Sequence, residues 1–182
     1  EKDPWKIQAE MIHRLSEGPY LVPPDYPVAL ARALESYNQV MVDSGSELAR
    51  LRAVKTESEI TWITRAQRAA EAAMETAVRL IRNAEIRSGV LFHEGAPLTS
   101  DIVRYEMNRI MLGHDCTAMD PIVACGPETA MPHCTGAGEL SAHQPIVIDV
   151  FPRDNKTGYH ADMTRTVSRG EPSGRVTELY EA

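Results

Sequence analysis

Apolar residues recur at helical spacing in the middle of the chain. From Ile60 onward they fall every three or four positions and so share one face of a helix: Ile60, Ile63, Ala66, Ala70, Ala73, Ala77 and Leu80. Thr56 precedes this run and Glu59 follows three residues later, which is the Thr-x-x-Glu pattern of a capping box. The pattern predicts a long amphipathic helix that begins near Thr56 and ends near Asn83.

A second helical stripe follows a connector, SGVLFHEGAPLTS, that contains glycine and proline. Thr99 or Ser100 is suited to cap this helix. Its predicted buried positions are Val103, Met107, Ile110 and Met111. Gly113 is expected to end it as the C′ residue.

The pattern then changes to short strand-like segments. PIVAC, PIVIDVF and GYHADMTRTVS each read as a strand, and the links between them are short. The order of two helices followed by several strands favours an α+β fold with an antiparallel sheet and flanking helices.

The first fifty residues show a different order. PPDYP reads as a turn, VALARALESY as a helix and NQVMVDS as a strand, which together suggest the end of an α/β domain. We therefore predict two domains, residues 1–52 and residues 53–182.

Composition narrows the range of functions. The formal net charge is −7 and the isoelectric point is about 5.4, so a nucleic-acid partner is not expected. No apolar run is long enough for a membrane span, and EKDPWKIQAE lacks the apolar segment of a signal peptide. Three cysteines are an odd number without CxxC spacing, which favours a cytoplasmic protein over one with a disulfide framework.

Both ends of the chain suggest a piece of a larger protein. The sequence does not begin with methionine, and VTELYEA stops soon after a new apolar stripe has begun. We expect residues to be missing on both sides.

Two aspartates interrupt the last two predicted strands. If these strands form a hairpin with RDNKTG at its tip, and Phe151 pairs with His160, then Asp149 lies directly opposite Asp162. Opposed side chains share a face, with Cβ atoms roughly 4.5–5.5 Å apart. Two carboxylates this close need a shared proton, a divalent cation or a pair of cations between them.

This register is an assumption, and other arrangements stay open. A slip of one residue or a bulge would turn one carboxylate to solvent. Nearby basic residues also offer ordinary salt bridges, from Arg153, Lys156 or Arg165.

The region around the two aspartates resembles a known family. IVIDVFPRDNKTGYHADMTRTVSRG is similar to the first metal-binding strand pair of the creatinase, aminopeptidase P and methionine aminopeptidase family, the pita-bread metallopeptidases. Upstream, LRAVKTESEI resembles the entry to the catalytic domain of Xaa-Pro peptidases, and PIVACGPETAMPHCTGAG resembles the strand and loop that carry the family's substrate-side histidine. The three motifs occur in the expected order.

The resemblance implies a partial pita-bread fold in which only the first half of the catalytic domain is present. Residues before Leu51 look like the end of the amino-terminal domain of Xaa-Pro peptidases, which favours that branch of the family.

The resemblance also implies roles for individual residues. Asp149 and Asp162 match the first two metal ligands, and His133 matches the histidine that contacts the substrate. The family's other ligands, one histidine and two glutamates, belong to the second half of the domain. The implied cofactors are two divalent cations, with Mn favoured and Zn, Co or Fe as alternatives. The implied reaction is hydrolysis of the peptide bond before a proline in second position by a metal-activated water.

We expect the chain alone to bind metal weakly and to be inactive, and to form a homodimer or to associate with its missing half. Two other functions stay open: a non-catalytic pita-bread binding module and a metal-free, creatinase-like hydrolase. The presence of both aspartates favours the metallopeptidase. An aspartic-protease dyad is less favoured because no D-T-G sequence flanks either residue.

Overall fold

A computed structural model describes residues 3–181. The chain divides into two compact units, residues 1–55 and residues 56–182. The division falls at the start of the predicted long helix. No helix among residues 3–181 is both long and apolar enough to cross a membrane.

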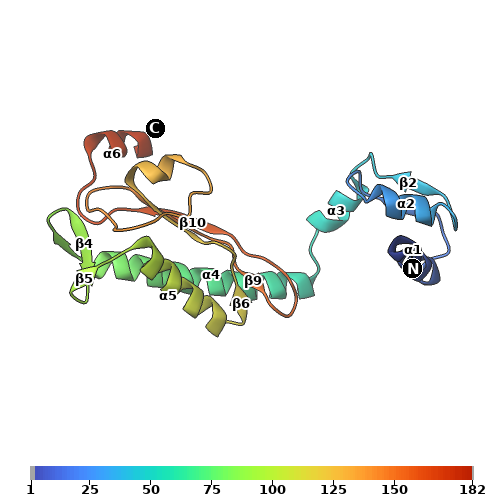
Figure 1. The fold of residues 1–182 in the computed structure, drawn as a ribbon, viewed down its shortest axis with the longest axis horizontal. Coiled ribbons are helices and arrows are strands. Elements are labelled where there is room, and N and C mark those ends of the chain that lie inside the picture. The colour runs from blue at the N-terminus through green and yellow to red at the C-terminus, as the bar shows by residue number, and fades with distance from the viewer. Residues whose placement is uncertain (1–2, 182) are drawn as a thin grey trace. The chain divides into compact units, whose positions relative to one another are not determined.

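The first unit is a small α/β arrangement (Figure 1). Its strands β1 and β2 pair in parallel, and helix α2 connects them. The sequence pattern predicts α2 and β2 but not β1. Its core consists of Ala9, Tyr20, Val22, Leu30 and Leu34. The elements are α1 (Pro4–Leu15), β1 (Tyr20–Val22), α2 (Val28–Leu34), β2 (Val40–Val42) and α3 (Glu47–Ala53).

The second unit begins with the long helix α4 (Glu57–Asn83). The predicted capping box is present: Glu59 N donates to Thr56 Oγ1 over 3.3 Å, and Thr56 N donates to Glu59 Oε2 over 2.7 Å. The buried face is built mainly from alanines, namely Ala66, Ala69, Ala70, Ala73 and Ala77. Small side chains let neighbouring elements approach the helix closely.

Helix α5 (Ser100–Gly113) lies beside α4 (Figure 1). Thr99 caps it by accepting a hydrogen bond from Ile102 N. The expectation that Gly113 is the C′ residue is wrong, because Gly113 is still helical and Asp115 adopts the left-handed conformation with φ +58°. An aspartate tolerates this conformation better than most residues, which is why glycine is not needed there.

The segment expected to be a connector is a small antiparallel sheet. Its strands are β3 (Glu85–Arg87), β4 (Val90–His93) and β5 (Ala96–Pro97), and their order is β3-β4-β5. Turns at Gly89 and Gly95, with φ +82° and +84°, reverse the chain between these strands. The glycines that suggested a loop therefore make two tight hairpins.

The main sheet has the order β10-β8-β7 and is antiparallel. Along β8, Ile146, Ile148 and Val150 are buried in one core with residues of α4 and α5, while Val147 and Asp149 are half-buried on the other face. The strands are β7 (Ile122–Cys125), β8 (Ile146–Val150) and β10 (Met163–Val167). The α+β fold with an antiparallel sheet and flanking helices is thus confirmed.

Shorter elements complete the unit. Strand β6 (Cys116–Thr117) pairs with β9 (Arg153–Asp154), a short 3₁₀-helix η1 (Gly126–Ala130) follows β7, and α6 (Gly174–Glu181) follows β10.

Candidate active site

The hairpin that carries both aspartates forms with a register different from the predicted one. Asp149 lies opposite Thr164, and Arg153 bridges His160. The assumed pairing of Asp149 with Asp162 is therefore wrong by two residues. Side chains along a strand alternate between the two faces of the sheet, so a shift of two residues leaves each side chain on its predicted face. Asp162, two positions before Thr164, falls on the face of Asp149 and diagonal to it.

The tip of the hairpin explains the shift. Asp154 N donates to Tyr159 O over 2.8 Å, and Gly158 N donates to Asp154 O over 2.9 Å. The Asp154 carboxylate closes the turn further, since Oδ1 accepts from Lys156 N and Thr157 N. The turn is therefore tighter than the predicted RDNKTG loop.

Asp154 is fully buried, and its charge is well compensated. Thr157 Oγ1 donates to Oδ1 over 2.9 Å, and Arg65 Nη2 from helix α4 lies 3.1 Å from Oδ2. Burial alone would raise the pKa of Asp154, but the hydrogen bonds from Thr157, the charge of Arg65 and the hydrogen bond from Lys156 N outweigh it and lower the pKa below its usual value. The tip is thus anchored to α4 as a charged, hydrogen-bonded unit.

A second contact holds the same part of the hairpin. Tyr159 Oη donates to Glu59 Oε1 over 2.5 Å, and the Tyr159 and Trp62 rings lie 5.4 Å apart. Both partners belong to the first turns of α4, so the strand leading to Asp162 starts from a fixed point.

The Asp149 carboxylate is itself oriented by a neighbour. Thr164 Oγ1 donates to Asp149 Oδ1 over 2.5 Å across the hairpin. Asp149 is half-buried, whereas Asp162 and Thr164 are exposed. One Asp149 oxygen is engaged by this hydrogen bond, and the carboxylate is held toward the strand that leads back to Asp162.

A hollow of about 260 Å³ brings together two of the three predicted site residues, His133 and Asp149. Asp162 is not among the residues that line it. The lining residues are Ile122, Ala124, Thr129, Met131, Pro132, His133, Val147, Asp149 and Thr164. The hollow is largely apolar and also contains a carboxylate, a histidine and hydroxyl groups.

His133 lies on the loop after η1 and is exposed, with a left-handed backbone at φ +66°. Such a φ is uncommon for a residue other than glycine and indicates a backbone fixed by its surroundings. The loop is stabilised by hydrogen bonds from Met131 N to Glu128 O and from Cys134 N to Met131 O, of 3.1 and 3.2 Å.

The donor chemistry of this face suits a hard divalent cation. Asp149 on β8 and Asp162, directly before β10, offer carboxylate oxygens, which suit hard divalent cations. Within residues 3–181, no group of three or more His, Cys, Asp or Glu side chains is arranged to hold an ion. The face thus fits part of a metal site, and further ligands are needed to complete one.

Sequence reasoning missed Thr164 as the partner of Asp149. Thr164 shares a strand face with Asp162, but only the observed register shows that Thr164 lies opposite Asp149. The ion pair of Arg65 with Asp154 was also missed, because it joins residues far apart in the chain.

The helix-backed sheet carries Asp149 on its open face, Asp162 lies on the same face just before β10, and His133 lies on the loop beside them. Residues 61–182 match metallopeptidase family M24. The match spans more than half of the chain, and the chain belongs to this family.

Two curated relatives are Xaa-Pro dipeptidases. The protein of Pyrococcus furiosus is 33% identical over 132 residues, which are 72% of this chain and 34% of the relative. The protein of Lactobacillus delbrueckii subsp. lactis is 28% identical over 140 residues, which are 76% of this chain and 35% of the relative. The chain therefore spans about a third of the length of these relatives.

Solved structures show the same fold. The Xaa-Pro dipeptidase of Bacillus anthracis matches with a TM-score of 0.70 and 24% identity, over 97% of this chain and 47% of that one. The X-Pro aminopeptidase of Thermotoga maritima matches with a TM-score of 0.67 and 26% identity, over 100% of this chain and 49% of that one. The predicted pita-bread fold, present in part, is confirmed.

Proposed function

We propose that the intact protein is a metal-dependent Xaa-Pro aminopeptidase or dipeptidase, and that this chain supplies part of its active site. The observation that carries the proposal is the placement of His133 and Asp149 around one hollow in a chain of family M24. The relatives named Xaa-Pro dipeptidase support the choice of substrate, a peptide with proline in second position.

The proposal assigns Asp149 and Asp162 to two divalent cations, with Mn favoured by the oxygen donors and Zn, Co or Fe as alternatives. Bound cations of this kind supply Lewis acidity at the scissile carbonyl. Thr164 keeps the Asp149 carboxylate in one orientation, because its hydroxyl donates to Oδ1.

His133 acts on the substrate in this proposal. Its imidazole lies at the wall of the hollow, where it can exchange a hydrogen bond with the carbonyl oxygen next to the reacting bond. The apolar part of the wall, which includes Ile122, Met131 and Val147, excludes water from the side chains of a bound peptide.

Two acidic ligands do not fix two cations, so the proposal expects weak metal binding and no activity from the 182-residue chain alone. One histidine and two glutamates from outside these residues would complete the site. We further propose a cytoplasmic protein that forms a homodimer or associates with the other half of its catalytic domain.

Peptide hydrolysis by the intact protein tests the proposal. With Mn²⁺ added, we expect cleavage of Xaa-Pro dipeptides or longer Xaa-Pro peptides, and little cleavage of the matching Xaa-Ala peptides. Asp149→Asn and Asp162→Asn should lower kcat/KM at least roughly 1,000-fold, and His133→Ala roughly 100-fold. His160→Ala is the matched control, because His160 is an exposed histidine of the same hairpin that does not line the hollow.

A protein that cleaves no Xaa-Pro peptide with any of the four metals contradicts the proposal. Tight binding of such peptides without hydrolysis would instead indicate a non-catalytic binding module, and hydrolysis that is insensitive to chelators would indicate the metal-free, creatinase-like reaction.

A further inference from the structure

We infer that Arg104 is a positioning residue that fixes the loop of His133 against the sheet. The inference rests on the proposed role of His133 and adds a residue that no sequence motif singled out. Arg104 lies on helix α5 and lines a hollow separate from the one that His133 lines.

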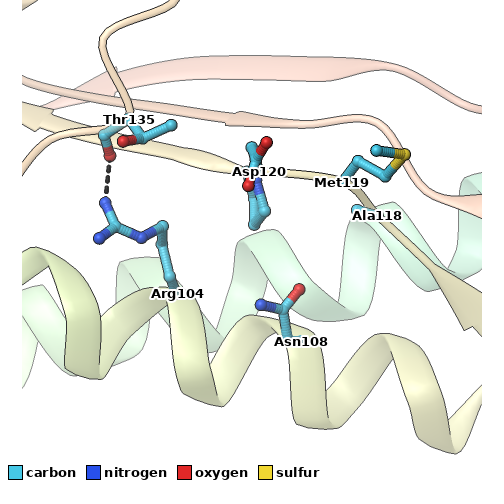
Figure 2. Close-up of a pocket in the computed structure, with 7 residues that line it drawn as sticks. Arg104, Asn108, Ala118, Met119, Asp120 and Thr135 are labelled. Atoms are coloured by element: carbon cyan, nitrogen blue, oxygen red, sulfur yellow. Dashed lines mark hydrogen bonds between the residues drawn. The ribbon is translucent and has the colours of Figure 1, made fainter.

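The Arg104 guanidinium reaches the backbone of the loop. Its Nη1 atom donates to Thr135 O and, over 2.6 Å, to Gly136 O, while Nη2 donates to the Asp101 carboxylate one turn earlier on α5. Figure 2 shows the guanidinium pointing at Thr135. The Arg104 side chain is only 16% exposed, so its hydrogen bonds to the two carbonyls are partly shielded from water, whereas the Asp101 side chain is 71% exposed.

The loop meets strand β7 at the same place. Thr135 O also accepts from Val123 N over 3.0 Å, so one carbonyl oxygen joins the loop both to α5 and to the sheet. Gly136 adopts φ +79°, and a Cβ there would lie 1.9 Å from Val123 O. The chain therefore passes β7 at a distance that only glycine permits.

This attachment lies two residues after His133. At its other end, the loop is closed by the hydrogen bond from Cys134 N to Met131 O. His133 therefore lies between two hydrogen-bonded points, which hold the backbone that carries its side chain. Arginine suits this task because its planar fork serves two carbonyls and a carboxylate at once, whereas lysine offers a single point charge.

Solvent reaches the guanidinium from one side. A hollow of about 350 Å³ borders Arg104, and Asn108, Asp120 and Thr135 also line it (Figure 2). If the side chain is shortened, a small guanidinium compound has a path to the vacated position. This makes chemical rescue a practical test.

Hydrogen exchange of the 182-residue chain tests the attachment directly. The Val123 amide bonds to Thr135 O and not to the neighbouring strand β8, so its exchange reports on the loop. We expect Arg104→Ala to speed Val123 exchange at least roughly tenfold, Arg104→Lys to speed it less, and methylguanidinium to restore protection to Arg104→Ala. Arg109→Ala is the matched control, because Arg109 lies on the same helix and pairs with the nearby Glu106, away from the loop.

Unchanged Val123 exchange in Arg104→Ala overturns the inference. So does a uniform rise of exchange over the whole sheet, because Arg104 would then stabilise the unit in general.

Kinetics of the intact protein test the consequence for His133. We expect Arg104→Ala to lower kcat roughly 10- to 100-fold without changing the metal content. In a protein that already carries His133→Ala, adding Arg104→Ala should lower kcat by less than about twofold. If the fold-losses of kcat in the two single variants multiply in the double variant, the inference is overturned. If the intact protein hydrolyses no Xaa-Pro peptide, the proposed function fails, and the exchange experiment alone decides the role of Arg104.

Discussion

Thr164 shows how one hydroxyl acts on the candidate site. We predict that Thr164→Val weakens Mn²⁺ binding by the intact protein roughly tenfold, because loss of the hydrogen bond frees the Asp149 carboxylate to rotate. Titration calorimetry measures the change. Thr166→Val is the control: Thr166 lies two positions along on the same strand, opposite Val147. Equal metal affinity of the two variants would contradict the prediction.

Asp154 makes stability depend on pH. Its pKa is lower in the folded state than in the unfolded chain, where it is about 3.9. The resulting stabilisation is therefore present above about pH 4–5 and is lost as the pH falls through the folded-state pKa. We predict that the free energy of unfolding declines between pH 5 and pH 3 less steeply in Asp154→Asn than in the original chain.

Urea unfolding at several pH values measures this difference. At pH 7 Asp154→Asn should be about 2 kcal/mol less stable, because the uncharged amide keeps an acceptor at Oδ1 but places an NH₂ group, itself a donor, where Oδ2 pairs with Arg65 Nη2. The exposed Asp120 supplies the control, Asp120→Asn. If the free energy of unfolding of Asp154→Asn varies with pH as it does in the original chain, the charge of Asp154 does not stabilise the tip.

Residue positions along the hairpin were predicted less well than its existence. The assumed pairing of Asp149 with Asp162 placed both aspartates on one face; the shared face agrees with the observed register, but the pairing does not, because the register depends on the turn. That turn is closed by the buried Asp154 carboxylate, whose partner Arg65 is distant in sequence. A local pattern holds no information about such a partner.

Elements with long periodic patterns were predicted best. Helix α4 and its capping box follow from local spacing alone, as do α5 and strands β7 and β8. The small sheet β3-β4-β5 was missed because its strands are short and their glycine turns resemble a loop. Its pairing depends on contacts with the chain around Leu140, since Leu91 N donates to Leu140 O.

The alanine face of α4 leads to a prediction at the same scale. Ala73 is fully buried within the main core, so Ala73→Leu should lower the free energy of unfolding by about 1–3 kcal/mol through overpacking. Ala72, which precedes Ala73, is only half-buried, and Ala72→Leu should lower the free energy of unfolding by less than half that amount. Thermal or urea unfolding compares the two. Equal losses would show that α4 is not tightly packed along this stripe.

At the scale of the whole molecule, the division at residues 55 and 56 separates two cores that share no residue. We predict that residues 56–182 alone unfold cooperatively, with a Tm within about 3 °C of the corresponding transition in the full chain. Calorimetry of both proteins tests this. An unfolded or aggregated 56–182 segment would show that the second core needs the first unit.

The assignment of residues 1–52 to the amino-terminal domain of an Xaa-Pro peptidase stays a prediction. Its fold class follows from the order of helix and strand, whereas its relation to the peptidase rests on resemblance. The α/β pairing of β1 and β2 agrees with the expected class.

Glu59 closes the first turn of α4 and also receives the hydroxyl of Tyr159, a residue 100 positions later. Opening of the hairpin tip would therefore loosen the beginning of the helix at the same moment, although little of the chain between them need move. Local opening of the hairpin should then be visible far from it in sequence, as protease sensitivity or faster exchange just after residue 56. Exchange at the start of α4 would therefore report whether the hairpin tip is closed.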